Sequence, residues 1–285
     1  MKLRSTGQTA ITEIWLKNYD NKFFNPIVPD IAAFLTTKGN LPITATLDTT
    51  DKLTGRLLDI GCGDGEKSNL FQLIGFGVTA IDHDAGMLQK ARQSYPDIDF
   101  VQYEIEQTLP FADHTFDVIF SFSVFQYIDH QAVFRECQRI LQPGGCLILI
   151  ANLQNNPFIR LSRLLQKTID RRQETKDVRQ ETKDGALGSS PSRLLSYYTP
   201  HQFKALQDEF ASSSLSFYHI LTPLAHLRIF RKLLPLFAHL DKLLLKIPVM
   251  RRYCWLGLLT AKNCRLLTRE DPRVPPQQCS SASRV

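Results

Sequence analysis

The feature that most constrains this chain is a short apolar run that ends in three alternating glycines, at residues 57–65 (LLDIGCGDG). The apolar residues are typical of a buried parallel strand, and Asp59 is the only polar residue among them. Glycines at alternate positions let the backbone turn sharply and let a ligand approach the main chain. Residues 66–71 then have the character of the first turns of a helix. This order indicates a nucleotide site at the carboxyl end of a parallel sheet.

The spacing of the glycines excludes two common phosphate-binding motifs. A dinucleotide fingerprint, G-x-G-x-x-G, would need a third glycine at position 66, which is Glu66. A Walker motif would need a lysine directly after its last glycine, and none is there. The pattern present is D-x-G-x-G-x-G. Taken alone, the stretch also allows an ordinary strand-to-helix turn.

That spelling closely resembles the glycine-rich motif of class I S-adenosylmethionine-dependent methyltransferases. A second strand is expected at 78–81, followed by Asp82, which lies 21 residues after Gly61. A carboxylate at this place can accept hydrogen bonds from two ribose hydroxyls. The alternative role, a helix N-cap, suits Asp84 better because it directly precedes the next helical stretch.

Three further elements carry the resemblance. Residues 102–111 are similar to the family's D-A-E-x-LPF element, although Glu104 replaces its usual aspartate. An apolar strand is expected at 116–122, followed by an aromatic-rich loop at 123–129. The last element is L-x-P-G-G, at 141–145, before a fully apolar strand at 146–151.

The resemblance implies a fold, a cofactor and a set of site residues. The fold is α/β: a Rossmann-like, doubly wound, seven-stranded and mainly parallel sheet, with N-terminal helices and a helical insertion before the last strand. The cofactor is S-adenosyl-L-methionine, with no metal. Glu104 and Ile105 would contact the adenine, and Glu106 is a weaker match. The full set of expected cofactor contacts is Tyr19, Asp59, Gly61, Cys62, Gly63, Gly65, Asp82, His83, Glu104, Ile105, Ser121 and Phe122.

Residues 1–50 are expected to form a helical extension. Trp15, Tyr19 and Phe23 recur every four residues, as on one face of a helix from about Thr9 to Phe24. Packing of this face on the core is one interpretation. The other follows from the resemblance, since amino-terminal helices of such enzymes often cover the cofactor; Tyr19 would then lie near its methionine end.

Charge and cysteine content indicate which partners and which redox compartment to expect. The net charge is +6, and residues 224–252 hold seven basic residues against Asp241 alone, which equals the whole excess. The glycine-loop part is therefore close to neutral, and nucleic acid is not an expected partner. The six cysteines form no C-x-x-C pair, which favours reduced thiols in a cytoplasmic protein. No signal peptide or membrane span is recognisable.

The remaining chain divides by pattern into four parts beyond residue 50. We expect a cofactor-binding core at 51–152 and a polar, partly disordered insertion at 153–196, which carries a seven-residue repeat at 172–184 (RQETKD twice). Residues 197–267 would complete the same domain, and 268–285 would be a disordered tail. Within 223–252, apolar residues recur at helical spacing and Pro235 divides the run. This basic insertion is either a helical cap with a solvated face, or a membrane-surface helix or lid over a lipophilic acceptor.

The predicted activity is methyl transfer from S-adenosylmethionine to a small-molecule or lipid-like acceptor. The alternatives are an RNA methyltransferase and a non-catalytic regulatory subunit that binds the cofactor. The sequence lacks the (Asn/Asp)-Pro-Pro-aromatic and Pro-Cys motifs of base methylation. His130, His201, His219 and Tyr127 are all candidates for a base, and none stands out, so no catalytic residue is named. The acceptor and the oligomeric state are not readable from the sequence.

Overall fold

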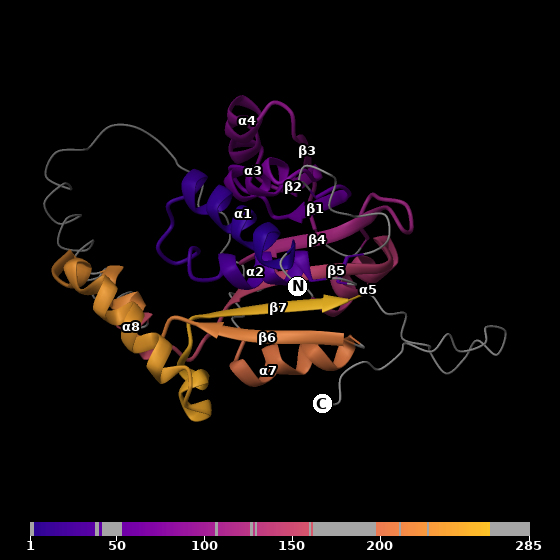
Figure 1. The fold of residues 1–285 in the computed structure, drawn as a ribbon. Helices are drawn as coiled ribbons and strands as arrows, with labels where there is room; N and C mark the ends of the chain where they lie inside the picture. The colour runs from indigo at the N-terminus through magenta and orange to yellow at the C-terminus, as the bar shows by residue number, and fades with distance from the viewer. Residues whose placement is uncertain are drawn as a thin grey trace, which may run out of the picture.

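The computed structural model describes residues 3–37, 40–41, 53–105, 108–125, 128, 130–159, 161, 198–210, 212–226 and 228–262. They form one seven-stranded sheet in the order β3-β2-β1-β4-β5-β7-β6 (Figure 1). Strand β7 pairs antiparallel with both of its neighbours, and the pairs among β1 to β5 are parallel. The mainly parallel sheet predicted from the sequence is thus confirmed. The strands are β1 Arg56–Ile60, β2 Gly77–Asp82, β3 Asp99–Gln102, β4 Phe116–Phe122, β5 Leu141–Asn152, β6 Ser212–Tyr218 and β7 Leu256–Lys262.

Helices cover both faces of the sheet. One apolar cluster contains buried residues from α1 (Leu3–Asn18), α2 (Val28–Thr36), α3 (Glu66–Leu73) and α4 (Ala85–Ser94). The other cluster lies on the opposite face, with α5 (His130–Ile140), α7 (Pro200–Ala205) and the short η2 (Leu206–Glu209). The alternation of strand side chains explains this: Phe120 and Ile148 belong to the first cluster, and Ile119 and Leu147 to the second.

The first helix ends earlier than its pattern predicts. Helix α1 stops at Asn18, so Tyr19 and Phe23 lie in the turn that follows it. The cause is Asn21, whose side-chain oxygen accepts hydrogen bonds from the backbone N–H groups of Phe23 (3.0 Å) and Phe24 (3.1 Å). Such local bonds compete with helical ones. The predicted helix from Thr9 to Phe24 is therefore wrong at its carboxyl end.

Other boundaries differ by a few residues for local reasons. Strand β5 begins at Leu141 rather than 146, because Leu141 pairs with Phe116 before an irregularity at 142–145. The glycine at 145 is required there, since an added Cβ would lie 2.9 Å from the carbonyl oxygen of Gln142. Helix α7 begins as expected, with Thr199 and Gln202 forming a capping box around a proline in the first turn.

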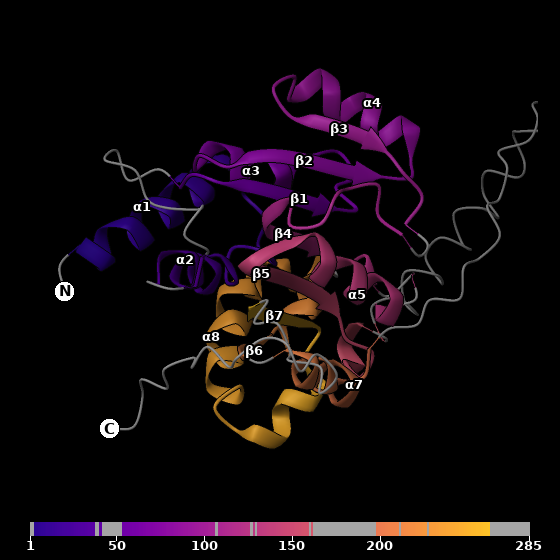
Figure 2. The same ribbon diagram turned by 90° about the vertical axis from the view of Figure 1, so that its right-hand side faces the viewer.

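The basic insertion lies beside the carboxyl end of β6 (Figures 1 and 2). It consists of the 3₁₀ turns η3 (Thr222–His226), η4 (Arg228–Leu233) and η5 (Pro248–Tyr253), and one α-helix, α8 (Leu234–Leu244). Pro235 lies in the first turn of α8, so the predicted division of the run is confirmed, although 3₁₀ turns stand where the first helix was expected.

No helix within the described ranges is long and apolar enough to cross a membrane. The repeat at 172–184, the tail from 268 and two of the six cysteines lie outside the described residues. The other four cysteines are reduced and buried. The proposed division of the chain into parts remains a prediction.

Candidate functional site

The glycine loop joins β1 to α3 at the carboxyl edge of the sheet. Its three glycines have positive φ angles, +75° at Gly61, +56° at Gly63 and +79° at Gly65. A Cβ on Gly61 would lie 2.1 Å from the side chain of Val124, and one on Gly65 would lie 2.7 Å from Phe100. At Gly63 the nearest atom would be 3.8 Å away. The outer two glycines are therefore required for packing, while the middle one leaves its backbone open to a ligand.

Asp82, at the end of β2, holds this loop in place. Its Oδ2 accepts a hydrogen bond from the backbone N–H of Gly63 (2.8 Å), and its Oδ1 accepts one from the N–H of Asp84 (2.9 Å). The side chain of His83 lies 3.2 Å from Oδ1 and is largely exposed. A carboxylate offers about four acceptor positions, so the remaining ones are available to ribose hydroxyls. The structure thus adds a positioning role to the predicted ribose contact.

Asp84 is the N-cap of α4, as predicted. Its side chain accepts hydrogen bonds from the backbone N–H groups of Gly86 (2.8 Å) and Met87 (3.0 Å). These bonds hold the pKa of Asp84 below its ordinary value. Because Asp84 caps α4, the Asp82 carboxylate is not needed as a cap and bonds to the glycine loop instead.

Asp59 lies beneath the glycine loop and not on its surface. It is 1% exposed, and its Oδ2 accepts a hydrogen bond from Ser68 Oγ (2.6 Å). Burial raises the pKa of the Asp59 carboxyl to about 6, although Ser68 and the charge of Lys67 lower it. Cys62 is buried beside it, and burial raises the pKa of that thiol far above its ordinary value. Both residues support the loop from below.

An aromatic group from three distant segments lies at the same edge. Tyr19 and Phe24 come from the N-terminal turn, and Phe122 ends β4; Phe24 packs against Tyr19 (5.5 Å between ring centres) and Phe122 (5.9 Å). The ammonium of Lys67, from the first turn of α3, lies 5.5 Å from the ring centre of Tyr19 and 4.8 Å from that of Phe122. The structure therefore brings Tyr19 beside the end of β4 and the start of α3.

Three of the other predicted contacts are less closely associated with this edge. Glu104 is exposed and Ile105 is half-buried, packed on the apolar cluster around α5. Ser121 is fully buried and donates its hydroxyl to the carbonyl oxygen of Ile60 (2.9 Å), which ties β4 to β1. Glu106 and Tyr127 lie outside the described residues, as does the side chain of His130.

Of the other candidate bases, only His219 lies near the N-terminal turn. It is 4% exposed, and its Nε2 lies 2.7 Å from the carbonyl oxygen of Phe23, to which it donates. His201 is exposed on α7. Lys67, Phe24 and His219 were missed or left open by sequence reasoning, because their partners lie far away along the chain, up to 196 residues for His219.

The N-terminal turn bridges the two halves of the sheet. Phe24 packs toward β4, whereas the ring of Phe23 packs on His219 (5.8 Å) and Trp255 (5.1 Å), next to β6 and β7. The Tyr218 hydroxyl also donates a hydrogen bond to Asp30 on α2. Residues 19–30 therefore lie along the carboxyl edge from β4 to β6.

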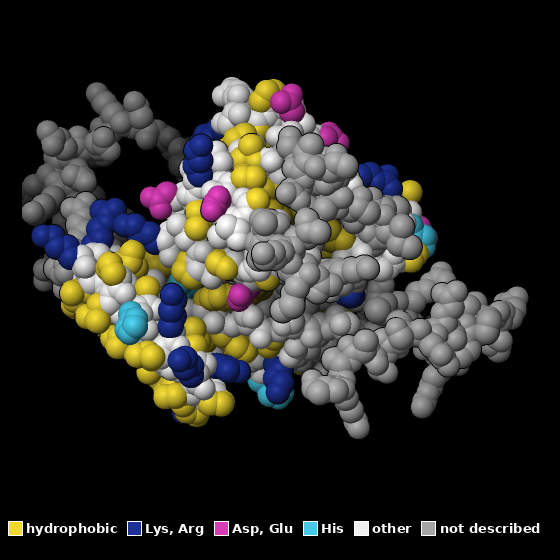
Figure 3. Space-filling view, in the orientation of Figure 1, with side chains coloured by type: hydrophobic (Ala, Val, Ile, Leu, Met, Phe, Trp, Pro, Cys, Tyr) yellow, Lys and Arg dark blue, Asp and Glu magenta, His cyan; other side chains and the backbone are white. Residues whose placement is uncertain are grey.

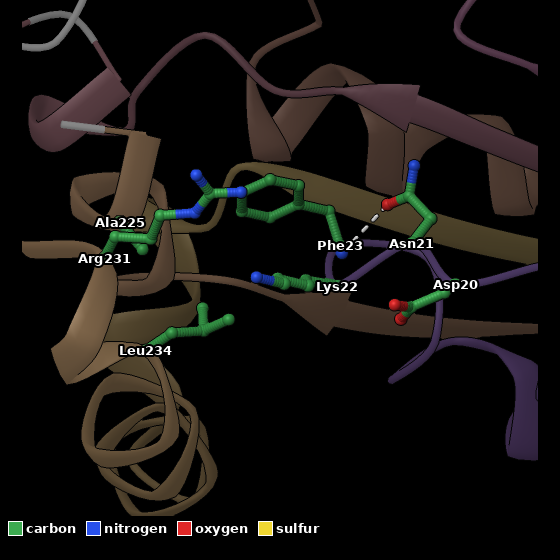
Figure 4. A pocket seen from close by; sticks show the side chains of 7 residues that line it. All are labelled: Asp20, Asn21, Lys22, Phe23, Ala225, Arg231 and Leu234. Atoms are coloured by element: carbon green, nitrogen blue, oxygen red, sulfur yellow. Dashed lines mark hydrogen bonds between the residues drawn. The ribbon is translucent and has the colours of Figure 1, made fainter. Parts of the chain in front are cut away.

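Two adjoining cavities of about 420 Å³ each open between this turn and the basic insertion. Figure 4 shows the first, where Arg231 extends toward the ring of Phe23 and Lys22 lies below it. The second cavity is mostly apolar. It shares Lys22 and Leu234 with the first, and its lining includes Pro26, Phe217, Tyr218, Pro235, Ala238 and Leu245.

Comparisons with known proteins find similarity over the part of the chain that holds the loop. Residues 58–149 match the family model described as a methyltransferase domain. The chain is 35% identical to a demethylmenaquinone methyltransferase of Renibacterium salmoninarum over 95 residues, 33% of this chain and 40% of that protein. It is 35% identical to a malonyl-[acyl-carrier protein] O-methyltransferase of Yersinia pestis over 117 residues, 41% of this chain and 43% of that protein. A solved S-adenosylmethionine-dependent methyltransferase of Mesorhizobium loti is 18% identical, with a TM-score of 0.46, over 73% of this chain and 90% of that one.

The chain spans roughly two-fifths of the length of these curated relatives. Within that part, an open glycine backbone and an adjacent carboxylate at the ends of β1 and β2 fit a nucleoside with an amino acid group, such as S-adenosylmethionine. Among the described residues, no group of three or more His, Cys, Asp or Glu side chains is placed to hold a metal ion. The glycine loop and the strands beside it lie within the part of the chain, residues 58–149, that matches the methyltransferase-domain model.

Proposed function

We propose that this protein transfers a methyl group from S-adenosylmethionine to a small, largely apolar acceptor. The observation that carries the proposal is the glycine loop held by Asp82 at the carboxyl edge of the sheet, within the matched methyltransferase domain. In this proposal Gly61 and Gly63 lie against the cofactor, and the free acceptor positions of Asp82 bind its ribose hydroxyls. Glu104 and Ile105 would contact the adenine.

The methionine end of the cofactor would lie toward Tyr19, Lys67 and Phe122. The Lys67 ammonium is held over two aromatic rings, and it would bind the carboxylate of the methionine moiety. The rings of Tyr19 and Phe122 would exclude water from the sulfonium, whose positive charge favours an aromatic face. These three residues would therefore fix the direction in which the methyl group points.

S-adenosylmethionine supplies an activated methyl group, so the protein's own contribution is mainly positioning and the exclusion of water. A base is needed only if the acceptor loses its proton near the transition state. His219 donates Nε2–H to the carbonyl oxygen of Phe23 in the structure. We assign it no catalytic role.

The acceptor class is inferred from the second cavity. Its volume of about 420 Å³ and its predominantly aliphatic and aromatic lining suit a small lipophilic molecule. It lies beside the N-terminal turn, which contributes Lys22, Asn25 and Pro26 to its lining. The printed names of two relatives, a demethylmenaquinone and a malonyl-[acyl-carrier protein] methyltransferase, agree with acceptors other than nucleic acid.

The test is calorimetric titration with S-adenosylhomocysteine, and with NAD beside it, using wild type, Asp82→Ala and Asp84→Ala. Wild type is expected to bind S-adenosylhomocysteine and not NAD. Asp82→Ala should bind about 100-fold more weakly, because it loses ribose contacts and frees Gly63. Asp84→Ala is the matched control, since it removes a neighbouring carboxylate that only caps α4, and should retain its affinity.

Acceptors are then sought with S-adenosylmethionine labelled on its methyl group. Transfer of label into an organic-extractable product would support the proposal. Label in RNA would favour the alternative of an RNA methyltransferase. Binding of the cofactor with no transfer to any cell fraction would favour a regulatory subunit. Failure of well-folded protein to bind S-adenosylhomocysteine would refute the whole assignment.

A further inference from the structure

The outer surface of the basic insertion combines exposed apolar and exposed cationic side chains. On α8, Leu236 (51% exposed) and Leu243 (48%) lie two turns apart on one side of the helix; Ile247 (49%) follows its carboxyl end and Val249 (53%) lies in η5. Lys242 and Lys246 are exposed along one flank of this stripe, and Arg251 and Arg252 are exposed beyond its end. We call these eight residues the cationic apolar surface.

The charge of this surface is uncompensated. Asp241 is the only acidic residue between 223 and 253, and it is 4% exposed. Across the part of the chain that the structure describes, none of the four basic side chains forms a salt bridge. Arg251 and Arg252 instead approach the carbonyl of Leu245 (3.0 Å) and the hydroxyl of Tyr253 (2.6 Å). An anionic partner would therefore meet no competing carboxylate here.

Buried polar contacts fix the surface to the sheet. The Asp241 carboxylate, on the inner side of α8, accepts hydrogen bonds from the N–H groups of Leu221 (2.7 Å) and Thr222 (3.1 Å), and from the Thr222 hydroxyl. The stripe of Leu236, Leu243 and Ile247 consequently faces outward. Figure 3 shows hydrophobic side chains along this rim of the molecule with Lys and Arg groups beside them, and no Asp or Glu on the rim in this view.

We propose that the cationic apolar surface is a docking site for an anionic lipid bilayer, with α8 lying in the plane of the interface. Aliphatic residues on one side of a helix with flanking lysines are suited to that position, because the apolar side chains enter the acyl boundary and the lysines reach the headgroups. A nucleic acid would use the charges but gain nothing from exposed leucine and isoleucine. The apolar cavity lined by Ala238 and Leu245 opens behind the same helix. The docking site does not depend on the proposed methyl transfer.

The experiment is flotation of the full chain with vesicles of phosphatidylcholine alone, or with about one-third phosphatidylglycerol. Binding is expected only to the anionic vesicles, and it should weaken as salt is raised, since surface charge is screened. Each basic residue is expected to contribute about fivefold, so Lys242→Gln with Lys246→Gln should lower partitioning about 25-fold. Leu243→Ser with Ile247→Ser should abolish the fraction that persists at high salt.

Two matched variants serve as controls, and both should bind as wild type. Lys17→Gln with Lys90→Gln removes two exposed charges from α1 and α4, and Leu16→Ser with Leu73→Ser removes two exposed leucines from α1 and α3. The salt dependence of vesicle binding is measured on the wild type, so it tests the proposal even if a variant fails to fold.

Four results would overturn the proposal. The first is no binding to anionic vesicles, and the second is an equal loss in the charge control and in Lys242→Gln with Lys246→Gln. The third is a dimer of the wild type in sedimentation that is dissociated by Leu243→Ser with Ile247→Ser, together with no binding to vesicles. That result would assign the surface to a second copy of the chain. Tighter binding to an RNA oligonucleotide than to anionic vesicles would also contradict it.

Discussion

The glycine loop and the region around β6 lie at the same edge of one sheet, but they are built differently. The loop is held by backbone hydrogen bonds and by carboxylates close by in the sequence, such as that of Asp82 to Gly63, 19 residues apart. The region around β6 depends on side chains that join segments nearly 200 residues apart, such as His219 to Phe23 and Tyr218 to Asp30. We call the glycine loop and the strand ends that hold it, residues 57–84, the cradle, because its contacts are local in the sequence. We call the region where residues 19–30 meet β6 and β7 the assembled enclosure, because its contacts join distant segments.

This difference predicts that the two regions can be perturbed separately, and Asp241→Ala is the strongest test. The substitution leaves three donors of Leu221 and Thr222 without their buried acceptor. We expect the free energy of unfolding to fall by about 4 kcal/mol, since each unsatisfied buried group costs about 1–3 kcal/mol. Denaturation in urea measures the loss.

The affinity of the folded Asp241→Ala variant for S-adenosylhomocysteine should remain within about twofold of wild type, because the atoms nearest to the loop glycines belong to Val124, Met87, Phe100 and Ala91 and not to α8. His239→Ala, an exposed change on the same helix, is the control and should be nearly neutral. A fall in cofactor affinity together with stability would show that the two regions form one cooperative unit and cannot be perturbed separately.

The same difference explains what the sequence could and could not predict. The glycine turn, Asp82 and the Asp84 cap are local, and the order of the strands up to β5 follows from apolar runs and glycine breaks. The structure places these residues as expected. Asp59 differs, because the sequence predicts a cofactor contact whereas the structure buries its side chain against Ser68. Position alone cannot distinguish a strand residue that faces the helix from one that faces the ligand.

The contacts of the assembled enclosure could hardly be predicted from local sequence patterns. The spacing of Trp15, Tyr19 and Phe23 suggested a continuous helix, and the Asn21 side chain ended it by bonding to Phe23 and Phe24. Nothing in the sequence connects Phe23 to His219 or Lys67 to Tyr19. Such pairs form only when the sheet is complete, so they follow from tertiary packing and not from pattern.

A second prediction concerns the pH dependence of the cradle. The pKa of Asp59 is raised to about 6 in the folded protein from 3.8, so the unfolded chain releases this proton at lower pH. The contribution of Asp59 to stability is complete below about pH 4 and is lost as pH rises through 6, by up to about 3 kcal/mol. Asp59→Asn keeps an acceptor for Ser68 and should therefore be more stable than wild type at pH 7.

Urea denaturation of both proteins at pH 5, 6 and 7 measures this effect, and the advantage of Asp59→Asn should widen with pH. Ser68→Ala is the opposing control: it removes the bond that lowers the pKa of Asp59 and should be less stable than wild type at pH 7. A constant difference across the three pH values would show that ionisation of Asp59 is not the cause.

A third, smaller effect is expected where α2 is joined to β6. Tyr218→Phe removes the hydrogen bond to Asp30, and we expect the free energy of unfolding to fall by about 1.5 kcal/mol, as for one bond to a charged group. Hydrogen exchange should increase in α2 and not in α3. Asp30→Asn retains an acceptor and should show a weaker effect; equal exchange in both helices would instead indicate that α2 is held by the core alone.

The smallest expected effect tests the contact between the two regions. Lys67 belongs to the cradle by sequence, but its ammonium lies over Tyr19 of the N-terminal turn. Lys67→Met keeps the aliphatic stem and removes the charge, so we expect about fivefold weaker binding of S-adenosylhomocysteine, from the loss of one partner for its carboxylate. Calorimetry measures the change, and Lys90→Met is the control for overall charge. An unchanged affinity would place the methionine end away from Tyr19, and an equal loss in both variants would show that only net charge matters.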